Sequence, residues 1–167
     1  YKTVTKLTSN KVNLIEDLVY YLKFDKDKNK KFSEVGLGLK FTKDKEKNSL
    51  IIKLISNTLN KLTIKNVNFY IFCEDKVWYE NDRMMYEELE LLLKEKKVSY
   101  IKPESYGHFI SSMKKNDFFI SMRFHAMVLA HKLNIPQFNI AYEKKCESYA
   151  SKFKINFVDV QNLNKLD

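Results

Sequence analysis

The chain has 167 residues, of which 44% are hydrophobic and 14% aromatic, so it is long and apolar enough for one globular domain and is not disordered throughout. Its formal net charge of +9 comes almost wholly from lysine, and Arg83 and Arg123 are the two arginines. The aromatic residues do not alternate with basic ones at a regular spacing, which argues against a nucleic-acid partner.

Membrane and metal-binding patterns are missing from the sequence. We find no apolar run of the roughly 18 residues that a transmembrane helix needs, and no signal peptide. We therefore expect a cytoplasmic protein without a transmembrane segment, in solution or at the inner face of the membrane. The two cysteines, Cys73 and Cys146, lie far apart and belong to no CxxC or HxxxH unit. We expect them to be reduced thiols, and we expect no metal and no cofactor.

From Ser33 on, strand-like and helix-like segments alternate. Short apolar runs between polar or proline-containing turns predict strands, and apolar residues at every third or fourth position predict helices. The predicted strands are 35–41, 66–73, 98–101, 117–121, 137–141 and 156–160, and the predicted helices are 44–62, 81–96, 104–115, 124–133 and 143–153.

Apolar strands separated by amphipathic helices are typical of a parallel sheet covered on both faces. Right-handed crossovers then favour an α/β fold, a Rossmann-like three-layer domain with a mostly parallel sheet of about six strands. We assign this domain to residues 33–167. Residues 1–32 do not fit the alternation and predict a leader or inter-domain segment. Because the chain begins at Tyr1, we expect a fragment of a larger protein.

One of the two arginines, Arg123, is expected at the edge of the sheet where such a fold binds its ligands. Ligands of open α/β sheets bind beyond the carboxyl ends of the strands, where the strand order reverses. With the order 3-2-1-4-5-6, Lys40 would end the first strand, and Arg123 and His125 would follow the fourth. Arg123 would also precede a helix, whose first N–H groups favour an anion. The pattern predicts a site for a small, doubly charged anion. The alternative is that Arg123 only pairs with a nearby acid.

Arg83 has a simpler interpretation. It lies in an acid-rich predicted helix together with Asp82, Glu87 and Glu88, where pairing between residues four positions apart accounts for it.

The stretch DFFISMRFHAMVLAHKLNIPQFNIAYEKKCESYASKF, at 117–153, resembles the C-terminal signature of the polysaccharide pyruvyl transferase family. The matching residues are Asp117, Arg123, His125, Ala126, Ala130, Pro136, Tyr142 and Lys145. Asn134 stands where glycine is usual. The run VGLGLKF, at 35–41, resembles an early strand of the family that often ends in Ser, an apolar residue and Arg. Gly38 and Lys40 stand at those two polar positions.

The resemblance implies a fold like that of GT-B glycosyltransferases, with two Rossmann-like domains and a cleft between them. This chain would be the half that binds the donor, phosphoenolpyruvate, and an N-terminal domain outside it would contribute to binding the saccharide acceptor. The reaction implied is transfer of the pyruvyl group to a sugar of a cell-surface polysaccharide, giving a pyruvate ketal. Arg123 would hold the phosphate or carboxylate, with Lys40 sharing the charge, and His125 would be the general acid. Tyr142 and Lys145 would reach the same crevice.

Two other functions stay open at this point. One is a GT-B donor domain for a nucleotide sugar, for which Glu143 and Glu147 are the acids available to hold ribose hydroxyls. The other is a non-catalytic Rossmann-like module.

Overall fold

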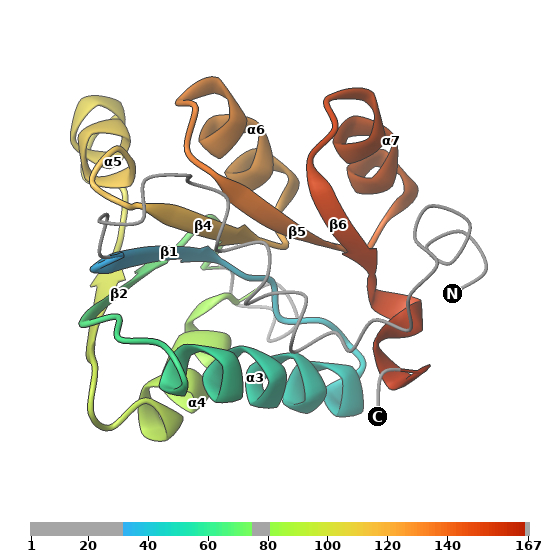
Figure 1. Cartoon of the computed structure of the whole chain (residues 1–167), viewed down its shortest axis with the longest axis horizontal. Coiled ribbons are helices and arrows are strands. Elements are labelled where there is room, and N and C mark those ends of the chain that lie inside the picture. Colours follow the sequence, from blue (N-terminus) through green and yellow to red (C-terminus); the bar gives the residue numbers. More distant parts are fainter. Residues whose placement is uncertain (1–31, 75–80, 166–167) are drawn as a thin grey trace.

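The computed structural model of the chain describes residues 32–74 and 81–165, and Figure 1 shows its arrangement. The leader segment predicted for 1–32 lies almost wholly outside the described residues. The strands are β1 (Glu34–Gly38), β2 (Asn66–Tyr70), β3 (Lys97–Ile101), β4 (Phe118–Ser121), β5 (Gln137–Ala141) and β6 (Asn156–Asp159). The helices are α3 (Lys45–Asn60), α4 (Arg83–Leu92), α5 (Tyr106–Met113), α6 (Phe124–Lys132) and α7 (Lys144–Lys152), and a 3₁₀ helix, η2 (Val160–Lys165), follows β6.

The six strands form one parallel sheet in the order β3-β2-β1-β4-β5-β6. The predicted Rossmann-like fold and its strand order are therefore confirmed. The order reverses between β1 and β4, which are hydrogen-bonded neighbours with Gly38 opposite Ser121. The carboxyl ends of these two strands are the place where such sheets bind ligands.

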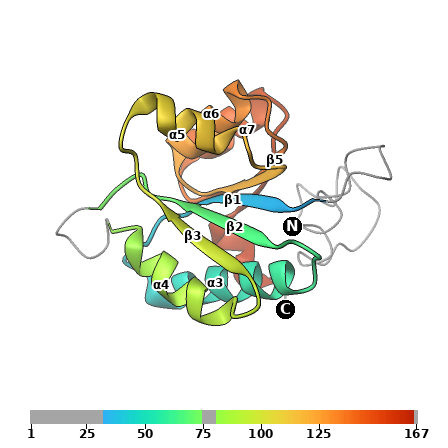
Figure 2. The ribbon, with the colours of Figure 1, turned by 90° about the vertical axis from the view of Figure 1, so that its left-hand side faces the viewer.

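Helices cover both faces of the sheet, as Figures 1 and 2 show: α3 and α4 lie on one face, and α5, α6 and α7 lie on the other. The alternation of side chains along each strand divides the core accordingly. Val35 and Leu37 of β1 belong to the cluster under α3, which also contains Ile51 and Ile55. Phe119 of β4 and residues of α5 and α6 make a second cluster, and residues of α6, α7 and β5 make a third. This burial on both faces explains why the strands are apolar throughout. Among the described helices, none is long and apolar enough to cross a bilayer.

The end of α6 explains the asparagine found where glycine is usual. Asn134 has a φ of 54°, in the left-handed region that glycine and asparagine adopt most easily. Its N–H donates to the carbonyl of His131 at 3.0 Å, and the N–H of Ile135 donates to that of Ala130 at 2.9 Å. These two bonds make a Schellman motif, which ends α6 and turns the chain into β5.

Strands β1 and β2 end earlier than predicted, for different reasons. Beyond Gly38, the neighbouring strand β4 gives way to α6. Beyond Tyr70, the backbone N–H groups of Phe72 and Cys73 donate to a side chain, the carboxylate of Asp82, instead of a neighbouring strand. Lys40 therefore lies two residues after β1 rather than at its end. The 3₁₀ helix η2 was not predicted.

Candidate functional site

The carboxyl ends of β1 and β4 are joined by their backbones at the start of α6. The carbonyl of Gly38 accepts hydrogen bonds from the N–H groups of Met122 and Arg123, at 2.8 and 2.9 Å. Arg123 is the N-cap residue of α6, and the N–H of Met127 donates to its carbonyl at 3.1 Å. The N–H groups of the first helical turn have no partner within their own helix and give this end a partial positive charge. The predicted position of Arg123 at the switch point is confirmed.

The side chain of Arg123 is paired with a buried carboxylate that comes much earlier in the sequence. Its Nε donates to both oxygens of Asp82, at 3.0 and 3.2 Å, and its Nη2 donates to Oδ1. Arg123 keeps 11% of its side-chain surface exposed, and Asp82 keeps none. A planar guanidinium matches a carboxylate in this forked manner, which fixes its orientation as well as its charge.

Two backbone amides complete the surroundings of the Asp82 carboxylate. The N–H groups of Phe72 and Cys73 donate to its Oδ2 at 3.1 and 3.0 Å. Burial raises the pKa of Asp82 above its ordinary value, while the hydrogen bonds and the charge of Arg123 oppose that rise. Asp82 thus joins the residues after β2 to the side chain of Arg123.

Nothing in the sequence set Asp82 apart from the other acids around Arg83, but its side chain is buried. Asp82 is the N-cap residue of α4, and it is buried against the end of β2 because that strand stops early. Arg83 does pair within its helix as expected, with its Nε 2.8 Å from the Glu87 carboxylate. Asp82 falls inside the predicted helix 81–96, and nothing in the sequence links it to Arg123.

His125 lies in the first turn of α6, two residues after the N-cap, and is exposed. Its ring is 6.1 Å from that of Phe124, centre to centre, in an edge-on arrangement. The histidine is therefore close in the chain to the switch-point arginine and reachable from solvent.

The other predicted residues approach α6 from the ends of β1 and β5. Lys40 Nζ lies 4.9 Å from the centre of the Tyr142 ring. Lys145 Nζ is 3.0 Å from the Glu143 carboxylate and 5.6 Å from the centre of the Phe124 ring. These contacts connect the residues after β1 and β5 to the first residue of α6. The structure thus gathers all five predicted site residues at the same edge of the sheet.

At this edge, the pKa values of the neighbouring residues Tyr142 and Glu143 are shifted in opposite directions. Burial raises the pKa of the Tyr142 hydroxyl, and the hydrogen bond to Glu143 raises it further, so the phenol stays protonated at neutral pH. The same hydrogen bond, together with Lys145, lowers the pKa of Glu143. Among the residues of this edge, Tyr142 is therefore a hydrogen-bond donor and Glu143 an ionised carboxylate.

Lys40 and Tyr142 also line an open pocket of about 450 Å³ between α3 and η2. Arg123, His125 and Lys145 are not among its lining residues, so the pocket adjoins the start of α6 without enclosing it. The full lining is Lys40, Thr42, Lys43, Asp44, Lys47, Tyr142, Val160 and Gln161. Three lysines against one aspartate give the pocket an excess of positive charge.

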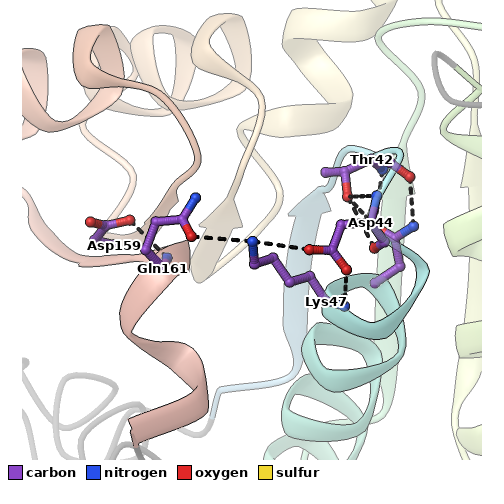
Figure 3. A network of polar contacts seen from close by, with 6 residues as sticks. Thr42, Asp44, Lys47, Asp159 and Gln161 are labelled. Carbon is purple, nitrogen blue, oxygen red and sulfur yellow. Dashed lines mark hydrogen bonds and ion pairs between the residues drawn. The ribbon is translucent and has the colours of Figure 1, made fainter.

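Figure 3 shows how one wall of this pocket is held. Lys47 Nζ reaches the Asp44 carboxylate at 3.0 Å and the Gln161 side chain at 3.2 Å, so it ties the start of α3 to η2. Asp44 caps α3 by accepting from the N–H of Lys47 at 3.1 Å, and Asp159 accepts from the N–H of Gln161 at 2.8 Å. The pocket wall is therefore built from local hydrogen bonds at the starts of α3 and η2 and from the Lys47–Gln161 bond that joins them.

No group of three or more His, Cys, Asp or Glu side chains suited to a metal ion occurs in the part of the chain that the structure describes. Lys40, Arg123 and Lys145 bring cationic groups to the sheet edge, the kind that binds anions, and Glu143 brings one carboxylate beside Lys145.

Comparison with known proteins agrees with this geometry. The model of the family described as polysaccharide pyruvyl transferase matches residues 4–144, most of the chain. This chain belongs to the polysaccharide pyruvyl transferase family. The matched region contains Lys40, Arg123, His125 and Tyr142, and Lys145 follows one residue after its end. As a family of transferases acting on polysaccharides, it implies a donor substrate and a sugar acceptor. No curated protein matches the chain significantly.

Proposed function

We propose that this pyruvyl transferase family member binds phosphoenolpyruvate at the carboxyl ends of β1 and β4 and transfers its pyruvyl group to a saccharide. The observation that carries the proposal is the position of Arg123. It caps α6 at the point where the strand order reverses, with its guanidinium held by Asp82 and 11% of its side chain exposed. Lys40 and Lys145 bring two more cations to the same edge.

The charge of the donor suits this arrangement. Phosphoenolpyruvate carries a phosphate and a carboxylate, and both need cationic or N–H donors that are in place before the reaction begins. Arg123 and the first turn of α6 supply one such group of donors. Lys40 supplies a second, at the border between this helix start and the pocket beside α3.

The proposed reaction forms two carbon–oxygen bonds and breaks one. A proton adds to the methylene carbon of the donor, making it the methyl group, and a sugar hydroxyl adds to the central carbon. The phosphate then leaves with the bonding electron pair, and a second hydroxyl of the same sugar adds in its place. Each hydroxyl loses its proton: one replaces the proton given to the methylene carbon, and the other leaves with phosphate. The product is a cyclic pyruvate ketal.

His125 is the residue we assign to the first proton. It is exposed in the first turn of α6, and histidine changes its charge nearer to neutral pH than any other side chain. The single O–H of Tyr142 donates to Glu143, so Tyr142 serves the site through the contact of its ring with Lys40. In this proposal the acceptor is held by a second Rossmann-like domain, as in GT-B enzymes.

Calorimetric titration with phosphoenolpyruvate tests the proposal. Wild type should bind saturably, Arg123→Ala should not, and Arg83→Ala should bind like wild type. Arg83 is the matched control because it is the other arginine of the chain and is exposed on α4, paired with Glu87. A nucleotide sugar titrated in parallel tests the glycosyltransferase alternative, and binding of that ligand alone would overturn the proposal.

Folding of each variant is checked by urea denaturation, because Arg123→Ala leaves the buried Asp82 carboxylate without its partner. Loss of one member of a buried ion pair costs about 3–5 kcal/mol. Should this variant fail to fold, Lys40→Ala takes its place, since the Lys40 side chain is half-buried and lines an open pocket. Unchanged affinity in folded Arg123→Ala, or in Lys40→Ala where it stands in, would also overturn the proposal.

A further inference from the structure

The Asp82 carboxylate is held from two directions at the edge of the sheet. On one side it accepts from the backbone N–H groups of Phe72 and Cys73, directly after β2, and the N–H of Asp82 donates to the carbonyl of Cys73 at 3.0 Å. On the other side it accepts the fork formed by Nε and Nη2 of Arg123. With none of its side chain exposed, Asp82 has little room to move.

Arg123 is consequently fixed at both ends. Its backbone N–H is bonded to Gly38 of β1, and its guanidinium is bonded to the carboxylate held by the end of β2. A free arginine side chain samples many rotamers and loses that freedom when it binds a ligand. Here the freedom is already lost, and because the guanidinium is planar, the bond to Asp82 also sets the orientation of its plane.

We propose that Asp82 is a positioning residue for the donor site: it holds the Arg123 guanidinium in the orientation that receives the donor anion. This inference rests on the proposed function. It differs from a role in which Asp82 merely neutralises Arg123. A neutralising acid weakens anion binding, so its removal would tighten binding, whereas removal of a positioning acid weakens it.

The test is Asp82→Asn, with Asp117→Asn as the matched control. Asp117 also accepts two backbone N–H groups, those of Ser33 at 3.0 Å and Glu34 at 3.1 Å, but it does so at the opposite end of the sheet. We expect the Kd for phosphoenolpyruvate to rise about tenfold in Asp82→Asn and to change by less than about twofold in Asp117→Asn, since the first alone removes a preorganised orientation. Unchanged or tighter binding in folded Asp82→Asn would overturn the inference.

A second measurement does not depend on the donor. The chain has two arginines, so a ¹⁵N-labelled sample gives two side-chain Nε–H signals, and Arg123→Lys assigns them by elimination. In wild type we expect the Arg123 signal to exchange slowly with water and that of the exposed Arg83 to exchange fast. In Asp82→Asn the Arg123 signal should become fast, while in Asp117→Asn it should stay slow. A signal that stays slow in Asp82→Asn would show that other contacts orient Arg123.

The Kd for phosphoenolpyruvate and the exchange of the Arg123 Nε–H signal together distinguish failure of the proposed function from failure of this inference. If wild type does not bind phosphoenolpyruvate, the proposed function fails, and the Nε–H signal alone then decides whether Asp82 holds Arg123. If Asp82→Asn does not fold, Arg123→Lys decides instead, because lysine keeps the charge but lacks the planar fork. We expect it to bind about tenfold more weakly than wild type. Equal binding would show that orientation by Asp82 has no part in the site.

Discussion

Lys40 Nζ lies over the ring of Tyr142, 4.9 Å from its centre, and this contact spans the end of β4. The lysine follows β1 and the tyrosine follows β5, and β4 lies between those two strands in the sheet. A cation within about 6 Å of a ring centre is attracted by its face. The contact therefore holds the lysine beside the helix start that Arg123 caps.

This position predicts that Lys40 contributes to binding the donor anion. We expect Lys40→Ala to raise the Kd for phosphoenolpyruvate about tenfold, which corresponds to about 1.4 kcal/mol. Lys40→Arg should bind about as well as wild type, because it keeps the charge and can also stack on Tyr142. Titration calorimetry measures both. The control is Lys53→Ala, an exposed lysine of α3 outside the pocket lining, which should leave the Kd unchanged. A Lys40→Ala variant that binds normally would place the anion elsewhere.

The assignment of His125 predicts a loss of turnover with little loss of binding. His125→Gln should lower the rate of phosphate release by about 10²- to 10⁴-fold, the usual worth of a positioned acid, in an enzyme supplied with its acceptor. Its Kd for phosphoenolpyruvate should stay close to that of wild type. His108→Gln is the control, an exposed histidine in the first turn of α5. If binding and turnover fall together, His125 is a binding residue and the acid lies elsewhere.

Local patterns in the sequence were enough to predict where Arg123 lies. Apolar strands alternate with amphipathic helices, and right-handed crossovers leave few ways to order six such strands, so the switch point followed from chain order. The left-handed turn after α6 was not predicted, although Asn134, which has that conformation, stands where glycine is usual.

Asp82 could not be found in this way. It lies 41 residues before Arg123, and its buried carboxylate accepts hydrogen bonds from the N–H groups of Phe72 and Cys73, beyond the end of β2. In sequence it looks like one more acid at the start of an acid-rich helix. The pairing of Asp82 with Arg123 is set by tertiary packing, and no periodicity or spacing in the sequence predicts it.

The pKa of Glu143 predicts a small pH dependence of stability. The hydrogen bond from Tyr142 and the charge of Lys145 lower this pKa below its ordinary value of 4.5. The ionised form is thus favoured by the fold, so its stabilisation is complete above pH 4.5 and is lost as the pH falls through the lowered folded value. The side chain is 39% exposed, so the effect is small.

Urea denaturation of wild type and Glu143→Gln between neutral and acid pH measures this contribution. The difference in free energy of unfolding should be largest near neutral pH and should vanish at the acid end. In a Tyr142→Phe background the same difference should shrink, because the phenylalanine cannot donate the hydrogen bond. A difference that grows on acidification would mean that the pKa of Glu143 is raised, not lowered.

The last prediction concerns Gly38, where β1 passes under the first turn of α6. A Cβ atom at this position would lie 2.5 Å from the Cβ of Ala126, and the carbonyl of Gly38 also accepts from the N–H groups of Met122 and Arg123. Gly38→Ala must therefore push the helix start away from the strand. We expect it to lower the free energy of unfolding by about 1–3 kcal/mol, as overpacking usually does, and to weaken donor binding by moving Arg123.

Gly107→Ala is the matched control, since a Cβ there meets nothing within 4 Å. It should stabilise α5 by up to about 1 kcal/mol because alanine is the better helix former. Ala126→Gly alone should cost about 1 kcal/mol for the same reason, but in the Gly38→Ala background it relieves the contact. The double variant should thus be more stable than the sum of the two single changes predicts. Strict additivity in urea denaturation would show that the strand and the helix start do not press on each other at this point.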